Sequence, residues 1–152
     1  MAKKLTFKRL KEFTGKEVGL SEWMEITQDR INSFADCTED NQWIHVDQEK
    51  ARKSPLKGTV AHGYLLLSLL PYFNFQNEVF SLNYKMAVNY GLNRVRFIKA
   101  VKAGSRIRNR AVLREVTKRG FRQILLLSEN TIEIEGEEKP AMVAETLALI
   151  YL

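Results

Sequence analysis

The stretch EDNQWIHVD, residues 39–47, sets a carboxylate and an imidazole close together in the chain. Histidine titrates near neutral pH and a nearby carboxylate tunes it, so Asp40 and His45 together can hold one water molecule as a general acid/base pair. A regular helix or strand would turn these two side chains apart. They therefore converge only in a turn, which the polar run TEDNQ favours, and we expect Trp43 and Ile44 to anchor that turn to the core.

The spacing also leaves a structural interpretation open. In that interpretation Asp40 caps or closes the turn, and His45 is a buried residue whose ring is satisfied by hydrogen bonds.

The motif VAHGYLLL, residues 60–67, holds a second group of candidates. Gly63 lies where an apolar helix should begin, and unpaired N–H groups at a helix N-terminus stabilise negative charge developing on an oxygen. Gly63 can equally mark a close crossing against a strand. We expect the neighbouring His62 to brace the loop as a hydrogen-bond donor.

The elements that position these motifs follow from the residue pattern. Residues 17–27 are predicted to form a strand, and Thr27 to cap a helix over residues 28–37. Asp47 is expected to cap a short exposed helix over residues 47–53.

The run from residue 64 to residue 73 is apolar on every side. A helix without a polar face must be wrapped by other elements, so we expect this one to be central and buried. Pro71 either kinks it or starts a new turn.

The second half of the chain is strand-like. Arginines alternate with apolar residues in SRIRNRAVLREVTK, which is the period of a half-buried strand. Turn signals KRG and GEEKP predict hairpins, and hence an antiparallel meander. The predicted strands are residues 94–101, 105–118, 121–136 and 141–152.

These elements together predict an α+β fold in which a curved antiparallel sheet wraps one helix. A sheet this small covers a helix incompletely, so we expect a dimer. The chain has 152 residues, 45% of them hydrophobic, which predicts one domain spanning residues 1–152.

Composition excludes several classes of protein. Cys37 is the only cysteine, which rules out an intramolecular disulfide and fits a reducing cytoplasm. With two histidines in the chain, a histidine-rich metal site is implausible. The N-terminus lacks the apolar run of a signal peptide, and residues 64–73 are too few to cross a bilayer. We expect a soluble cytoplasmic protein without a metal.

The net charge of +6 is concentrated in one region. Between Arg94 and Arg122 the chain has eleven Lys or Arg residues and a single acid, Glu115. This excess predicts an anionic partner, or else an ordinary solvated sheet face. Arginine-rich strands also bind nucleic acid, but we find no helix-turn-helix or RNA-binding aromatic motif.

The segments FADCTEDNQWIHVDQEKA and GTVAHGYLLLSLL resemble the MaoC-like dehydratases, the (R)-specific enoyl-CoA hydratase group, and most closely their NodN-like branch. NYGLNRVRF and VKAGSRIR extend the resemblance over about residues 30–105. The resemblance implies a hot-dog fold, with an antiparallel sheet around a long central helix. It also implies a homodimer, or a higher oligomer of dimers, with active sites near the protomer interface.

The resemblance also implies catalytic roles. Asp40 and His45 match the family's Asp and His that hold the catalytic water, and Gly63 matches the glycine whose N–H polarises the thioester carbonyl.

The chain departs from the usual family motif, which reads Gly-Asp-x-Asn-Pro-[Leu/Ile]-His. Glu39, Gln42 and Trp43 replace its glycine, asparagine and proline. Gln42 still carries an amide, but its side chain is longer than that of the asparagine it replaces. The Trp43 side chain narrows the space beside Asp40 and His45. Some hydratases also carry a serine where this chain has Pro71.

We therefore predict an enzyme that reversibly hydrates trans-2-enoyl thioesters to (R)-3-hydroxyacyl thioesters. No cofactor is needed, because coenzyme A or phosphopantetheine is part of the substrate. The expected substrate contacts are Gln42, Trp43, His62 and Tyr64, with phosphates held by several of Arg94, Arg96, Lys99, Arg106 and Arg108.

Three alternatives remain. A hot-dog thioesterase would bind the thioester in the same way but would direct water to the carbonyl carbon. A non-catalytic acyl-thioester binder and a nucleic-acid-binding protein are the others.

Overall fold

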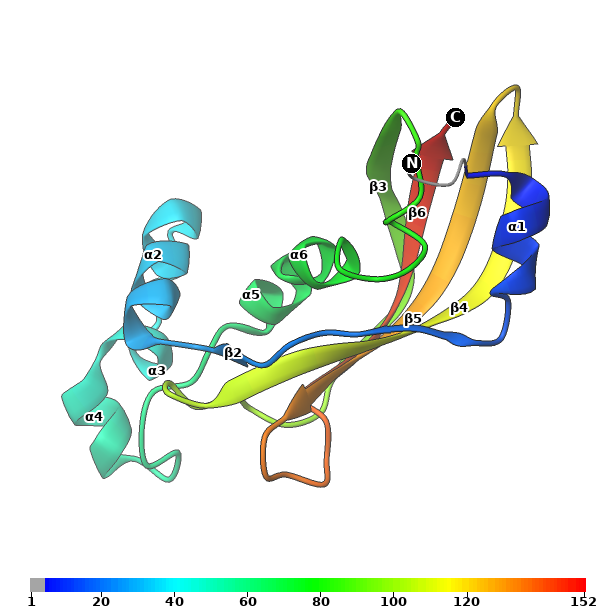
Figure 1. The fold of residues 1–152 in the computed structure, drawn as a ribbon. Helices are drawn as coiled ribbons and strands as arrows, with labels where there is room; N and C mark the ends of the chain where they lie inside the picture. Colours follow the sequence, from blue (N-terminus) through cyan, green and yellow to red (C-terminus); the bar gives the residue numbers. More distant parts are fainter. Residues whose placement is uncertain (1–4) are drawn as a thin grey trace.

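The computed structural model describes residues 5–152 and is built around one curved antiparallel sheet (Figure 1). The strand order is β1-β4-β5-β6-β3, and β2 pairs with β4 beside β1. The strands are β1 Glu17–Leu20, β2 Met24–Glu25, β3 Met86–Phe97, β4 Arg106–Gly120, β5 Gln123–Ile134 and β6 Met142–Tyr151.

The helices lie in three places around this sheet. Figure 1 shows α1 against the far end of β4, α5 and α6 in the hollow of the sheet, and α2 to α4 grouped beyond its other end. The helices are α1 Phe7–Glu12, α2 Gln28–Thr38, α3 Trp43–Val46, α4 Gln48–Lys53, α5 Gly63–Ser68 and α6 Leu70–Asn74.

The apolar core has two parts, because the sheet is longer than either group of helices that covers it. One part joins α5 and α6 to residues such as Ile107, Ile132 and Met142 of the sheet. The other lies under α1 and the loop before β3, around Leu113 and Leu126. Alternate residues of the long strands fill both parts, as the two-residue period of a strand requires.

The capping predictions are confirmed. The Thr27 side chain accepts a hydrogen bond from Arg30 N (3.2 Å) at the start of α2, and Asp47 accepts one from Lys50 N (2.9 Å) at the start of α4. Helix α2 ends at Glu39, whose φ of 63° turns the chain out of the helix. This turn leads directly into the single turn of α3.

The central helix differs from its prediction. It is divided at Leu69 into α5 and α6, and Pro71 lies in the first turn of α6, where its missing N–H costs nothing. The expectation that it is buried on every side is wrong for the single chain. Tyr64 is 68% exposed and Tyr72 55%, because the sheet covers only one face of the helix.

The sheet topology also corrects the predicted meander. Strands β4, β5 and β6 follow one another, but β3 pairs with β6 rather than with β4. Strand β3 begins at Met86, before the predicted start at residue 94, and ends at Phe97. The predicted early strand is divided into β1 and β2, and α1 was not predicted.

No helix within residues 5–152 is long and apolar enough to span a membrane.

Candidate active site

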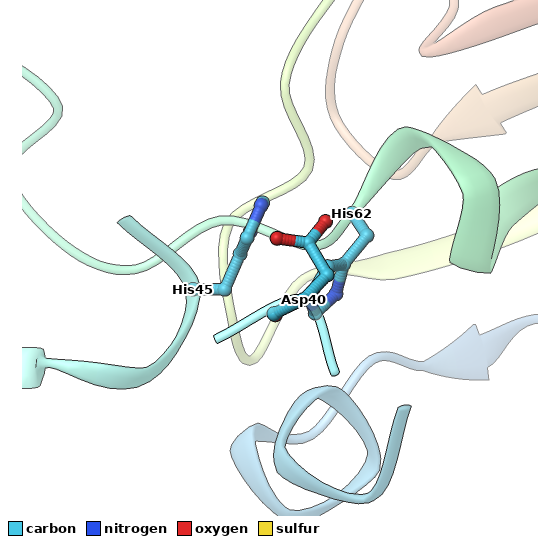
Figure 2. A group of neighbouring side chains, drawn as sticks. All are labelled: Asp40, His45 and His62. Carbon is cyan, nitrogen blue, oxygen red and sulfur yellow. The ribbon is translucent and has the colours of Figure 1, made fainter. Parts of the chain in front are cut away.

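Asp40, His45 and His62 come together where α2, α3 and the start of α5 meet (Figure 2). Each offers one oxygen or nitrogen atom, and these atoms all lie within 4.8 Å of one another. Asp40 is exposed in the turn after α2, whereas His45 is buried in α3. Figure 2 shows the Asp40 carboxylate directed toward the tip of the His45 ring. The two side chains therefore face the same small space.

The hydrogen bonds of His45 define its tautomer. Its Nδ1 lies 2.6 Å from the carbonyl oxygen of Val60, and because a carbonyl oxygen only accepts, Nδ1 carries the hydrogen. Nε2 of the neutral ring then keeps a free lone pair. Burial lowers the pKa of His45 below its ordinary value of 6.5, and the neighbouring His62 lowers it further against the opposing effects of Val60 and Asp40. His45 is therefore neutral at physiological pH and able to accept a proton.

His62 connects the turn to the helix start. Its side chain is 2% exposed, and its ring stacks on that of His45 with centroids 3.7 Å apart. Nε2 donates to the backbone oxygen of Asp40 (3.0 Å), which is the contact expected of a loop-bracing histidine. Nδ1 is buried without a hydrogen-bond partner in the described chain.

Gln28, in the first turn of α2, holds the backbone of α3 and was missed by the sequence reasoning. Its Nε2 donates to the backbone oxygen of His45 (2.8 Å), and its Oε1 accepts from the hydroxyl of Thr59. The backbone of α3 also accepts a hydrogen bond from Val60 N at Ile44 O (3.0 Å). No sequence signal beyond the position of Gln28 after the Thr27 cap pointed to this role.

Gly63 is the first residue of α5, with His62 as the cap. Within residues 5–152 the N–H groups of Gly63 and Tyr64 donate to no protein acceptor, as is usual for the first positions of a helix. A Cβ on Gly63 would lie 3.0 Å from the ring of Phe97. The two interpretations of Gly63 are thus compatible, because a close crossing and a free N–H occur at the same residue.

The other predicted substrate contacts differ in exposure. Gln42 is exposed, and its side chain makes no capping hydrogen bond to α3. Trp43 is half-buried, with the ammonium of Lys50 4.8 Å from its ring centroid. Tyr64 projects from α5 and meets Phe97 edge to face, with centroids 6.0 Å apart.

Most of the predicted phosphate-binding cations are paired within the chain. Arg106 binds Glu135 (3.0 Å), Arg108 binds Glu133 (2.7 Å), and Lys99 binds Glu137. The antiparallel register of β4 and β5 brings Glu133 and Glu135 opposite Arg108 and Arg106, whereas Lys99 and Glu137 lie in the loops after β3 and β5. The arginine-rich face of β4 is therefore largely neutralised.

Arg94 and Arg96, on the edge strand β3, form no salt bridge within residues 5–152. They line a hollow with Ile98, Glu129 and Glu145. Of the predicted cations, these two have the most capacity left for an external anion.

The Asp40, His45 and His62 group has the residue types of a metal site but not a suitable geometry. The two rings are nearly parallel, at 23°, so their in-plane lone pairs do not converge as tetrahedral zinc ligands must. The arrangement suits a water molecule held between Asp40 and His45 better than a metal ion.

Comparison with known proteins identifies the family of this chain. Residues 9–136 match the family model described as the MaoC like domain. Nodulation protein N of Rhizobium leguminosarum bv. viciae is 47% identical over 137 residues, covering 90% of this chain and 85% of that protein. The 3-hydroxyacyl-thioester dehydratase Z of Mycobacterium tuberculosis (strain H37Rv) is 45% identical over 134 residues, covering 88% and 87%.

Solved structures show the same architecture. A monoamine oxidase regulatory protein from Archaeoglobus fulgidus has a TM-score of 0.83 at 22% identity, covering 98% of this chain and 95% of that one. The HadBC complex (3R-hydroxyacyl-ACP dehydratase) of Mycobacterium tuberculosis has a TM-score of 0.71 at 18% identity, covering 87% and 95%.

The chain has the hot-dog fold, with an antiparallel sheet around the helices α5 and α6. It belongs to the MaoC-like domain family.

Proposed function

We propose that the protein is an acyl-thioester hydratase/dehydratase that interconverts trans-2-enoyl and (R)-3-hydroxyacyl thioesters. The observation that carries this proposal is the neutral, buried His45, whose free Nε2 shares one small space with the Asp40 carboxylate next to the start of α5. The 45% identity to a 3-hydroxyacyl-thioester dehydratase over 88% of the chain supports the reaction class.

In the proposed mechanism, Asp40 and His45 hold one water molecule. As the water oxygen forms its bond to C3 of the enoyl group, Nε2 of His45 accepts a proton from the water, and Asp40 stabilises the imidazolium. The π electrons of the C2–C3 bond move toward the thioester carbonyl. The pair then delivers one proton to C2, so both side chains return to their starting state. Dehydration follows the same steps in reverse.

The start of α5 is proposed to stabilise the enolate oxygen. The N–H of Gly63 has no acceptor among residues 5–152, and the dipole of the helix adds to its effect. Loss of such a donor typically costs ~3 kcal/mol of transition-state stabilisation. Gln42, Trp43 and Tyr64 are proposed to shape the mouth of this site, and the buried His62 to brace the turn behind it.

The remaining proposals concern the phosphate-bearing part of the substrate, the oligomeric state and the cellular location. Arg94 and Arg96 are proposed to bind phosphates of coenzyme A or a carrier's phosphopantetheine, whereas Arg106 is already paired with Glu135. A homodimer would cover the exposed side of α5 and α6, and a related dehydratase forms a complex. No metal or redox cofactor takes part in the mechanism, and the single cysteine favours a cytoplasmic location.

The test uses purified protein and crotonyl-CoA, followed by loss of enoyl absorbance with the thioester intact. Asp40→Asn and His45→Ala should each lower kcat/KM roughly 100-fold or more, because each removes half of the acid/base pair. Asp36→Asn, an equivalent change at an exposed position of α2, is the matched control and should keep full activity.

Thermal unfolding of each variant checks that the fold is kept. Full activity in Asp40→Asn or His45→Ala would refute the assignment. Release of free thiol with an unchanged enoyl group would instead identify a thioesterase, and binding without turnover would identify a non-catalytic acyl-thioester binder.

A further inference from the structure

A chain of hydrogen-bonded amide and hydroxyl groups lies beneath α6, inside an otherwise apolar core. Asn109 of β4 donates from Nδ2 to Asn74 Oδ1 (3.1 Å) and to Asn130 Oδ1 (2.9 Å). Asn130 in turn donates to the hydroxyl of Thr146 on β6 (2.9 Å). Asn109 is 2% exposed and Asn130 is fully buried. Polar groups are rarely buried in such a place unless they have partners.

This network ends in unused hydrogen-bonding groups. Asn109 donates both Nδ2 hydrogens, and its Oδ1 is buried with no hydrogen-bond partner in the described chain. The Nδ2 of Asn74 donates to no acceptor within residues 5–152. The Thr146 hydroxyl accepts one strong bond, and its own hydrogen has only a long contact, 3.4 Å, to the backbone oxygen of Ser128.

Asn74 and Thr146, at the two ends of the network, line a cavity between α6, β3 and β6. This cavity of about 60 Å³ is lined mostly by apolar residues, and none of the described residues that line it is charged. It shares Leu70, Pro71 and Leu147 with a wider groove of about 460 Å³ that continues along α5 to Leu67.

The groove therefore leads from one helical turn beyond Gly63 to the polar network. Eleven residues separate Gly63 from Asn74 along α5 and α6, which is roughly 16 Å at the rise of an α-helix. An acyl chain that follows this groove from a thioester carbonyl at the Gly63 N–H ends near Asn74 and Thr146.

We propose that the acyl chain of the substrate carries an uncharged oxygen function, a hydroxyl or keto group, in its distal half, bound by Asn74 and Thr146. This inference rests on the proposed hydratase function. A plain alkyl chain would shield the Asn74 amide from water without a partner and leave the Thr146 hydrogen only its long contact to Ser128, whereas an oxygen accepts from both. A carboxylate is disfavoured, because no Lys or Arg of the described part of the chain lines the cavity.

The experiment compares the wild-type chain on trans-2-dodecenoyl-CoA with analogues of the same length that carry one hydroxyl or keto group at successive distal carbons. The best oxygenated analogue should have a kcat/KM roughly tenfold or more above that of the plain chain, because sites built to hydrogen-bond a substrate reject analogues that lack the group.

Two variants locate the preference. Thr146→Val keeps the shape of the side chain and removes its hydroxyl, and Asn74→Leu removes the free amide. Each should bring the ratio of oxygenated to plain kcat/KM close to one. Thr131→Val, the same change at a residue outside the network on the Trp23 side of β5, should leave the ratio unchanged.

A wild type that prefers the plain chain, or variants that leave the ratio unchanged, would overturn this inference alone, provided that crotonyl-CoA is hydrated. Absence of hydration on every thioester would overturn the proposed function itself. Unfolding curves of the variants separate a lost preference from a lost fold.

Discussion

At the scale of single residues, His45 sets the pH dependence of the proposed reaction. Its burial places the pKa below the ordinary value of 6.5, so the imidazole is neutral and basic above that pH. We predict that kcat/KM for crotonyl-CoA hydration is unaffected by the ionisation of His45 from pH 7 upward. It should fall on the acid side of pH 6.5, where His45 becomes protonated. An acid limb centred above pH 6.5 would contradict this assignment.

The same shift affects stability. A pKa lowered by folding means that the unfolded chain binds the proton more readily, so the contribution of neutral His45 is complete above pH 6.5. It is lost as the pH falls through the lower folded pKa. The melting temperature of His45→Gln should therefore depend less on pH than that of the wild type below pH 6.5.

His62 is expected to position Asp40 rather than to react. His62→Phe keeps the stacking on His45 but loses the hydrogen bond to Asp40, while His62→Gln retains an N–H donor. At about 1 kcal/mol for that hydrogen bond, His62→Phe should lower kcat roughly fivefold. KM for crotonyl-CoA should change little, and His62→Gln should recover part of kcat. Equal losses in both variants would indicate a purely structural role.

The sequence predicted these residues better than it predicted their supports. Asp40 and His45 stood out because few side chains combine acid/base chemistry with a turn-forming context. The bonds to Val60 and Gln28 could not be predicted, because they join segments far apart in the chain through backbone oxygens, which leave no trace in residue type.

At the scale of elements, the face of β4 that points away from the core is held to β5 by a charge network. Glu133 accepts hydrogen bonds from Arg108 (2.7 Å) and Arg110 (2.8 Å), and Arg110 also binds Glu17 of β1. Burial alone would raise the pKa of Glu133, but the bonds from Arg110 and Arg108 lower it below 4.5. One carboxylate thus connects two arginines and, through Arg110, three strands.

We predict that Glu133→Gln lowers the free energy of unfolding at neutral pH by about 1 kcal/mol, discounted for partial exposure of the network. Because folding lowers the pKa of Glu133, its contribution is complete above pH 4.5 and is lost as the pH falls through the folded pKa. Urea titrations at pH 7 and pH 4 should therefore show a smaller difference between variant and wild type at the lower pH.

The matched control is Glu49→Gln on α4, where the pair with Arg52 is exposed and lies within one helix. It should change the free energy of unfolding by less than about 0.5 kcal/mol. A larger effect at Glu49 than at Glu133 would show that the cross-strand network adds no stability.

The elements with a clear period were predictable, and those defined by pairing were not. The alternation of arginine and apolar residues identified β4, and Thr27 identified the start of α2. Strand β3 was mostly missed because its first eight residues, MAVNYGLN, mix apolar residues with asparagine and glycine, and its pairing with β6 contains two register shifts. Long-range partners, rather than local preference, make this segment a strand.

At the scale of the whole molecule, one edge of the sheet and one face of α5 and α6 are not covered by other elements of residues 5–152. Strand β3 is the last strand of the sheet, so one of its edges lacks a hydrogen-bonding neighbour within residues 5–152. Large apolar side chains are also exposed on β3, α5, α6 and the residue after α6; they are Tyr64, Tyr72, Phe75, Met86, Tyr90, Leu92 and Phe97. Long exposed edge strands and apolar patches are avoided in proteins that stay monomeric.

A second copy of the chain is therefore expected to cover this side. Light scattering behind size-exclusion chromatography should give twice the chain mass of 17.6 kDa. Leu92→Lys places a charge in the middle of the exposed β3 face and should shift the mass toward one chain, with loss of crotonyl-CoA hydration if the site lies near the interface. Leu20→Lys is the control, because Leu20 is 42% exposed on β1, at the opposite end of the strand order from β3, and its substitution should leave the mass at two chains. A wild type that elutes as one chain while hydrating crotonyl-CoA would show that the helices α5 and α6 work with one face open to solvent.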